Sequence, residues 1–161
     1  MNKNLTEAMT NVDVAYDEVI DIANDMISEL TSDVDAMMQN AYENIENLSN
    51  DAIRELLIRL SLRSYSFSAI KDKSAFKATL AETLRKEAYA TQFNGAEGTV
   101  AVRENTAILG TSAEVVVEQL YDLTASLFRT KLDEIHRVVD TLKTVLTSRL
   151  SEAKLTSIDV N

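Results

Sequence analysis

Six acidic residues in the first third of the chain recur every four positions, a spacing that could build a surface for a basic partner. They are Asp13, Asp17, Asp21, Asp25, Glu29 and Asp33. On a helix, side chains four residues apart are neighbours, and like charges at that spacing repel. The ordinary interpretation is a solvated face, but such a face usually mixes in basic residues. Because no Lys or Arg lies between Lys3 and Arg54, the row is also a candidate partner-binding surface, for a DNA-binding groove or a basic helix.

A basic segment follows at residues 54–77, where cations alternate with aromatic residues. Its cations are Arg54, Arg59, Arg63, Lys71, Lys73 and Lys77, and its aromatic residues are Tyr65, Phe67 and Phe76. Single-stranded nucleic acid is bound by this combination, through phosphate neutralisation and base stacking. The alternative, which the overall acidity favours, is that these cations pair with the acidic helix within or between chains.

Few residues could hold a metal or perform catalysis. His136 is the only histidine, and although Asp133 lies three residues before it, a helical di-iron site needs two such motifs. We therefore expect His136 at a solvent edge or between paired helices. The chain has no cysteine, no glycine before Gly95 for a calcium loop, and no phosphate-binding or dinucleotide motif. The expectation is a protein that binds without catalysis, and without a metal or a cofactor.

The elements that position these residues are predicted from turn formers and apolar spacing. Proline is absent and only three glycines occur, which argues against sandwiches and barrels with their many turns. Apolar residues recur with helical spacing in two stretches. They are Val12, Ala15, Val19, Ile22, Met26, Leu30, Val34, Met37, Ala41, Ile45 and Leu48, then Val117, Leu120, Leu123, Phe128, Leu132, Ile135, Val139, Leu142, Leu146 and Leu150. The fold class predicted is all-α, an elongated bundle of long amphipathic helices with coiled-coil-like pairing.

Several local features predict where helices begin and end. Residues 12–48 could be one helix or two, because Thr31–Asp35 could interrupt them with a capping motif. Ser49-Asn50-Asp51 resembles a helix start, and a helix follows with Ile53, Leu56, Leu57 and Leu60 buried. Residues 64–69 alternate with period two and are ambiguous. A further helix from Ser74 should bury a face that carries Phe76, Leu80, Leu84, Ala88 and Phe93.

The glycines indicate where the chain turns. Asn94-Gly95 should end the helix that starts at Ser74, with Gly95 in the left-handed conformation, and residues 94–98 form the clearest turn. Gly110 either interrupts the next helix or is tolerated inside it. The apolar stripe from Val117 to Leu150 predicts a long C-terminal helix through residues 117–150.

Charge divides the chain into two parts. Residues 1–50 hold eleven acidic residues and one basic residue, whereas residues 51–161 hold fifteen of each. We therefore predict an acidic helical arm at 1–50 and a helical bundle at 51–161. A compact domain of this length has a radius of gyration of about 15 Å. Helices this long therefore cannot bury all their apolar residues within one such domain. This predicts a homo-oligomer, most simply a dimer. The absence of cysteine, of a signal peptide and of a membrane-spanning run predicts a cytoplasmic protein with no membrane partner.

The C-terminal two-thirds resembles small helical proteins of tailed phages. The resemblance is carried by residues 86–105, KEAYATQFNGAEGTVAVREN, and residues 130–150, TKLDEIHRVVDTLKTVLTSRL. This run is similar in outline to the phage recombination mediator family. The resemblance implies a helical protein that assembles into rings, binds single-stranded DNA and helps to load a recombinase. Lys71, Lys73 and Lys77 occupy a segment comparable to that family's basic DNA-contacting stretch.

Three functions remain open at this point. The leading hypothesis is a phage-encoded, non-enzymatic interaction protein that presents an acidic helical face to a protein partner. Such a protein would inhibit or recruit a nucleic-acid-binding machine, for example as an anti-defence protein in the host cytoplasm. The first alternative is a recombination mediator that binds single-stranded DNA through residues 54–77, and the second is a structural coiled-coil or assembly scaffold.

Overall fold

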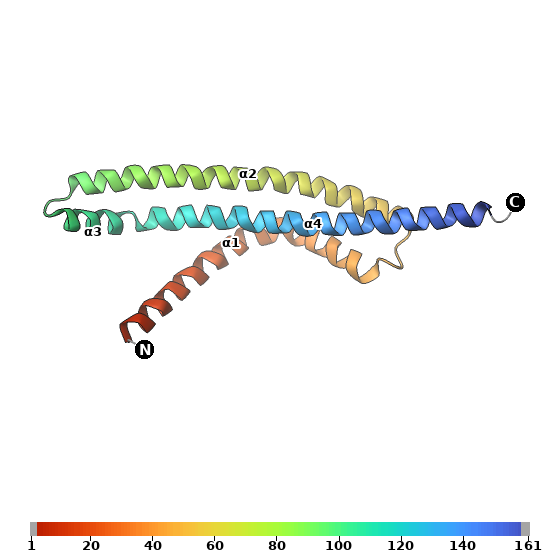
Figure 1. Ribbon diagram of the computed structural model, residues 1–161, viewed down its shortest axis with the longest axis horizontal. Helices are drawn as coiled ribbons and strands as arrows, with labels where there is room; N and C mark the ends of the chain where they lie inside the picture. Colours follow the sequence, from red (N-terminus) through yellow and green to blue (C-terminus); the bar gives the residue numbers. More distant parts are fainter. Residues whose placement is uncertain (1–2, 159–161) are drawn as a thin grey trace. The chain divides into compact units, whose positions relative to one another are not determined.

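The described residues form helices joined by short turns. A computed structural model describes the backbone of residues 3–158 and the side chains of residues 17–155. Four helices follow one another along the chain (Figure 1): α1 (Lys3–Asn44), α2 (Asn50–Gly95), α3 (Val100–Gly110) and α4 (Ser112–Ile158). These residues contain no strand, so the all-α prediction is confirmed.

Helix α1 runs without interruption through Thr31–Asp35, so the first stretch is one helix and not two. The Ser32 hydroxyl, which could have capped a second helix, bonds back onto its own helix instead. It donates to the carbonyl of Glu29 at 3.4 Å. Thr31 is buried, which places it in a packed face and not at a helix end.

The start of α2 follows the predicted capping chemistry. The Ser49 hydroxyl accepts a hydrogen bond from the backbone N–H of Ala52 at 3.1 Å, and Asp51 lies in the first turn. A side-chain oxygen at this position satisfies one of the N–H groups that a helix start leaves unpaired. The prediction of a helix start at Ser49-Asn50-Asp51 is therefore confirmed. The ambiguous residues 64–69 lie inside α2 and are helical.

The glycines act differently from the prediction in one respect. Helix α2 does end at Gly95, but the positive φ, 110°, belongs to Gly98 and not to Gly95. Gly98 therefore supplies the reversal between α2 and α3, because L-residues with a side chain avoid that conformation. Gly110 ends α3, and a Cβ atom there would lie 3.1 Å from the Gln92 side chain of α2. Gly110 thus permits a close approach of the chain to α2.

The chain divides into two compact units, and α1, α2 and α4 contribute to both. Unit 1 combines Met1–Ser28 with Ile70–Leu127, and unit 2 combines Glu29–Ala69 with Phe128–Asn161. The charge boundary at residue 50 does not coincide with this division, which cuts α1 after Ser28. In each unit α2 and α4 are antiparallel neighbours, since Arg85 contacts Glu118 in unit 1 and Phe67 contacts Phe128 in unit 2.

Unit 2 has a core of large apolar side chains from three helices. The Phe67 and Phe128 rings meet edge to face with centroids 5.4 Å apart, a geometry that aromatic pairs favour. Helix α1 lies antiparallel to α2, as the Asp33–Arg63 pair indicates, and parallel to α4. The buried apolar residues of this unit are Val34, Met37, Met38, Ala41, Ile53, Leu56, Leu60, Phe67, Phe128, Leu132, Ile135, Val138, Val139 and Leu142. Most predicted stripe positions in unit 2 are therefore buried, as expected.

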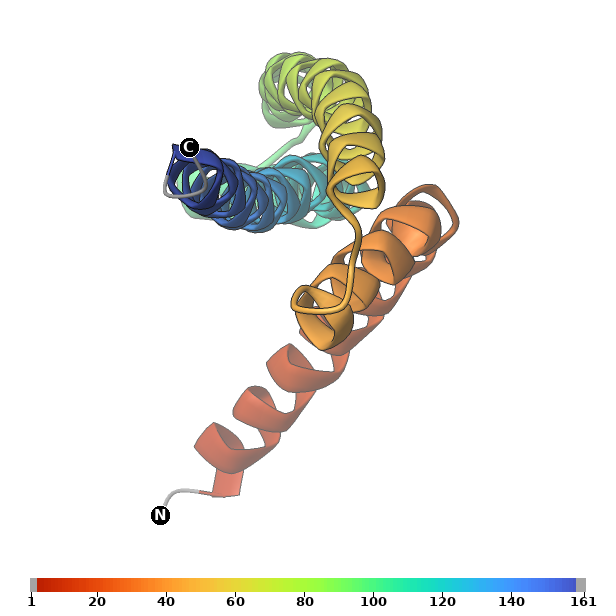
Figure 2. The ribbon, with the colours of Figure 1, turned by 90° about the vertical axis from the view of Figure 1, so that its right-hand side faces the viewer.

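The turn between α1 and α2 is held by an arginine from α4. The Arg149 guanidinium donates to the carbonyls of Leu48, Ile45 and Glu46 at 2.5, 2.9 and 2.9 Å. Figure 2 looks onto this turn, where the chain leaves α1 and enters α2. These carbonyls belong to the turn that follows α1, and a guanidinium has enough N–H groups to bond several of them at once. Arg149 therefore attaches α4 to the turn between α1 and α2.

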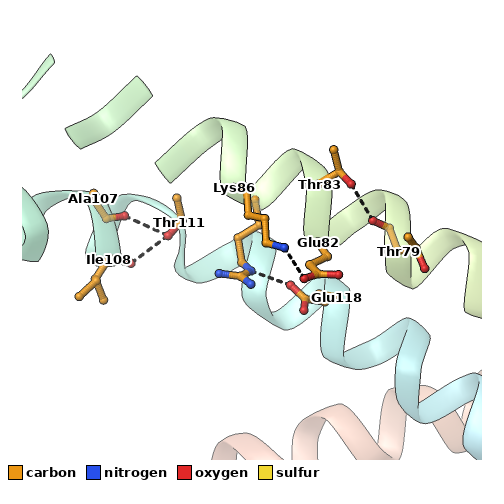
Figure 3. Close-up of polar contacts among 9 residues, drawn as sticks. Thr79, Glu82, Thr83, Lys86, Ala107, Ile108, Thr111 and Glu118 are labelled. Carbon is orange, nitrogen blue, oxygen red and sulfur yellow. Dashed lines mark hydrogen bonds and ion pairs between the residues drawn. The ribbon is translucent and has the colours of Figure 1, made fainter. Parts of the chain in front are cut away.

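Unit 1 is packed by small side chains. Its buried residues include Ala23 and Ile27 of α1, with Ser74, Ala78, Ala81, Ala107, Thr111, Thr124 and Ala125 elsewhere in the unit. Thr111, between α3 and α4, donates to the carbonyls of Ala107 and Ile108 at 2.9 and 3.3 Å (Figure 3). Small residues allow helices to approach closely, but they bury little apolar surface per residue.

Several large apolar residues of α1, α2 and α4 are exposed, contrary to the prediction. On α1 the residues Ile22, Met26 and Leu30 are exposed, and Ala23, Ile27 and Thr31 are buried in their place. On α2 the exposed fractions of Phe76, Leu80 and Leu84 are 70%, 49% and 52%. On α4, Val117 and Leu150 are exposed as well. The physical reason is that helical spacing identifies residues on one face, but not which face meets a neighbouring helix.

The alternating stretch at residues 64–69 provides a stability test. Phe67 has an exposed fraction of 1% and Tyr65 one of 83%, although they lie two residues apart on the same helix. We expect Phe67→Ala to lower the free energy of unfolding by about 3–5 kcal/mol, because it leaves a cavity beside Phe128. The control, Tyr65→Ala, should change it by no more than about 0.5 kcal/mol. Urea unfolding followed by circular dichroism measures both, and equal effects would contradict the packing described.

Candidate functional site

The predicted acidic row forms an exposed ridge on α1. Asp17, Asp21, Asp25 and Glu29 are exposed, and we call these four residues the acidic ridge. Residues two apart on a helix are about 200° apart around its axis. The ridge therefore lies on the side of α1 opposite to the buried Ala23 and Ile27. Asp13 belongs to the same predicted row, but its side chain lies outside the described residues.

The last residue of the predicted row, Asp33, forms an ion pair with Arg63 of α2. Arg63 of α2 donates through Nε to Asp33 Oδ2 at 2.8 Å and also contacts this oxygen through Nη2. Asp35 is likewise bound, to Lys131 of α4 at 2.9 Å. Both pairs lie in unit 2 and attach α1 to its neighbours there. Asp33 is thus a structural residue and does not belong to the free surface that the sequence predicted.

The acidic ridge has an apolar neighbour on the same helix. Ile22, Met26 and Leu30 each follow a ridge residue by one position, about 100° further around the axis. All three are exposed, so α1 presents carboxylates and large apolar groups side by side. Repulsion between carboxylates four apart costs only a few tenths of a kcal/mol per pair. The ridge therefore does not prevent the helix from forming, and it offers a surface that combines charge with apolar area.

The basic segment 54–77 does not form a free cationic surface. Five of its six cations contact groups of this chain: Arg54 with Asp51 (2.8 Å), Arg59 with Glu55 (3.6 Å), Arg63 with Asp33, Lys71 with Asp72 (3.2 Å), and Lys77 over the Tyr121 ring (4.8 Å). Among these cations, Arg63 pairs with the acidic helix, through Asp33, as the alternative interpretation predicted. The three other ion pairs join a cation to an acidic residue of α2 itself. Exposed pairs of this kind are weak, but they reduce the positive potential at the surface.

The aromatic residues predicted to stack on bases are separated by the fold. Phe67 lies in the core of unit 2 against Phe128, and it therefore cannot reach a base. This corrects its assignment as a nucleic-acid contact. Tyr65 is exposed. The sequence could not distinguish the two residues, because both occur in the same alternating stretch.

Four charged contacts were missed by sequence reasoning, two in each unit. Lys131 is partly buried and bonded to Asp35 at 2.9 Å and Glu134 at 2.7 Å. Burial acts to lower the pKa of Lys131, but the two carboxylates outweigh it and raise the pKa above its usual value. In unit 1, Arg85 of α2 contacts Glu118 of α4 at 2.6 Å. The neighbouring Glu82 binds Lys86 at 2.6 Å (Figure 3), and this hydrogen bond lowers the pKa of Glu82.

His136 is exposed and also contacts the neighbouring helix, so it combines the two positions predicted for it. Its Nε2 is 3.2 Å from Ser64 Oγ, so the contact joins α2 to α4 within unit 2. A serine nucleophile would also need donors for an oxyanion. Ser64 is in the middle of α2, where backbone N–H groups are bonded along the helix. We therefore assign the Ser64–His136 contact to helix pairing.

Possible metal ligands and membrane-spanning stretches bear on the function as well. Within residues 17–155, no three or more His, Asp or Glu side chains are grouped so that they could hold a metal ion. None of the four helices, over the residues described, has an apolar stretch long enough to cross a membrane. Comparison with protein-family models, with curated proteins and with solved structures finds no match to this chain.

The pairing of the cations leads to a test of nucleic-acid binding. We expect a labelled single-stranded oligonucleotide at low salt to show no change in anisotropy when this protein is added, because four of the six cations of the segment already contact acidic groups of the same chain. Binding that falls with salt, and that Arg59→Ala with Lys73→Ala weakens, would instead favour the recombination mediator.

Proposed function

We propose that the protein is a non-enzymatic interaction protein that binds a basic protein partner through the acidic ridge of α1. The partner's surface would carry cations next to apolar side chains, since the ridge lies beside Ile22 and Met26. Nucleic-acid-binding proteins have surfaces of this charge, and the proposal is that the partner is one of them. The protein would inhibit or recruit such a machine, for example as a phage-encoded anti-defence protein.

The observation that carries the proposal is a run of exposed carboxylates in a stretch without any basic residue. Asp17, Asp21 and Asp25 are exposed, and no Lys or Arg occurs between Lys3 and Arg54. Elsewhere in the described chain, by contrast, acidic residues such as Asp33, Asp35 and Glu118 bind cations across helices. The acidic ridge is therefore positioned to attract a cationic surface, over a range that salt limits to about 10 Å at 0.1 M.

The proposal includes self-association. Large apolar residues are exposed on α1, α2 and α4, which supports the predicted homo-oligomer, with a dimer as the simplest form. The acidic ridge would then be present twice in each assembly. Two linked ridges would bind a partner that has two basic sites more tightly than one ridge would.

A triple substitution of the ridge tests this function. We expect Asp17→Asn with Asp21→Asn and Asp25→Asn to abolish capture of the partner from nuclease-treated host lysate, because three exposed charges are lost without a change of shape. Circular dichroism should show unchanged helicity. Mass spectrometry of the captured proteins is the measurement.

The matched control removes three exposed carboxylates elsewhere in the chain. Glu97→Gln with Glu104→Gln and Asp122→Asn changes the net charge by the same amount, and all three residues are exposed. We expect this variant to capture the partner as the wild type does. Equal loss in both variants would mean that net charge acts and not the ridge. Unchanged capture by the ridge variant would refute the proposal.

A further inference from the structure

Helix α2 carries apolar residues on two opposite sides, and in unit 1 only one side is covered. Ser74, Ala78 and Ala81 are buried. Phe76 and Leu80 each lie two residues from Ala78, about 200° around the axis, and remain exposed. A helix that is apolar on both sides is typically buried on both sides. The uncovered side of α2 in unit 1 therefore needs an occupant.

The uncovered side forms a stripe with opposite charges at its ends. Its residues are Lys73, Phe76, Leu80, Leu84 and Glu87, all exposed, and we call it the α2 stripe. The steps are three, four, four and three residues, so the stripe is symmetric about Leu80. The mean step of 3.5 residues equals that of a coiled-coil seam, although a regular seam alternates steps of three and four. A basic residue at one end and an acidic residue at the other make the stripe complementary to a reversed copy of itself.

A hollow lies beside the stripe, between α2 and α4. It is lined by Ala81, Leu84, Ala113, Glu114 and Val117. Small side chains at Ala81 and Ala113 leave room there, and Leu84 and Val117 provide apolar walls. Phe76 projects from the same helix two turns before Leu84, and 70% of it is exposed. Unit 1 thus carries both a large apolar knob and a hole that is open to receive one.

From these features we propose that two copies of this chain pair through their α2 stripes, antiparallel and crossing at Leu80. In an antiparallel pair, each residue lies opposite the one that is equally distant from Leu80 on the other copy. Phe76 then faces Leu84 of the second copy and enters its hollow, and Lys73 faces Glu87. Both contacts occur twice, as a two-fold symmetric interface requires. A second copy is favoured over other occupants because this single register places Phe76 at the hollow of the other copy. The same register places Lys73 opposite Glu87.

The interface does not depend on the proposed function of the acidic ridge. The ridge is on α1 and the stripe is on α2, so each can be altered without the other. Loss of the dimer with retained capture of a basic partner would leave the ridge proposal intact. Loss of capture with a retained dimer would leave the α2 stripe intact.

The first experiment measures the mass of the purified full chain by analytical ultracentrifugation over a range of concentrations. We expect the wild type to form a dimer and Leu80→Glu to raise its dissociation constant at least tenfold, because two carboxylates would face each other at the crossing point. Leu62→Glu, on α2 in unit 2 and also exposed, is the matched control and should leave the dimer unchanged. A monomeric wild type at all concentrations, or a dimer that Leu80→Glu does not weaken, would overturn the proposal.

The second experiment tests the register with charges alone, and it remains valid if Leu80→Glu fails to fold. Lys73→Glu and Glu87→Lys should each weaken the dimer, because each places like charges opposite one another in both pairs. The double variant restores opposite charges and should recover most of the wild-type affinity. Single variants that bind as the wild type does, or a double variant that is no better than either single one, would refute the antiparallel pairing.

Discussion

The seam between α2 and α4 is the contact that each unit depends on, and its composition differs between them. In unit 2 the seam contains Phe67 and Phe128 in edge-to-face contact, with large aliphatic residues around them. In unit 1 the seam contains Ala78, Ala81, Thr124 and other small residues. Apolar burial stabilises roughly in proportion to the area removed from water. Unit 2 therefore gains more from its own core, and unit 1 retains large apolar residues that a partner could cover.

The acidic residues also fall into two groups, those that are paired with a cation of another helix and those that are exposed. Acidic residues that face another helix are bound, as Asp33 is by Arg63, Asp35 by Lys131 and Glu118 by Arg85. The ridge residues of α1, at Asp17, Asp21, Asp25 and Glu29, face away from the packed side of the helix and are exposed. Four of the eleven acidic residues among the first fifty therefore lie exposed along one side of α1. A concentrated charge of one sign favours association with a surface of opposite sign.

The sequence predicted the all-α fold, the start of α2 and part of the core for identifiable reasons. The separate helix predicted from Ser74 was wrong, because Ser74 lies inside α2. Ser49 begins α2 because its hydroxyl can pair a backbone N–H, and the scarcity of glycine and proline leaves few places for other breaks. The residues from Phe128 to Leu142 were correctly placed in the core, because one stripe of α4 there is much more apolar than the rest. The prediction failed at Ile22, Met26, Phe76 and Leu80, where two adjacent or opposite faces are both apolar enough to be buried.

The amino-acid sequence by itself determined that the chain is helical, where its negative charge lies and which residues share a face of each helix. These properties depend on local bonding and on the helical repeat, which neighbouring residues define. Only the tertiary structure decided that Phe67 is buried while Tyr65 is exposed, and that Asp33 is paired while Asp25 is not. Those outcomes depend on how each helix is rotated about its axis against its neighbours, and the helical repeat is the same for every rotation.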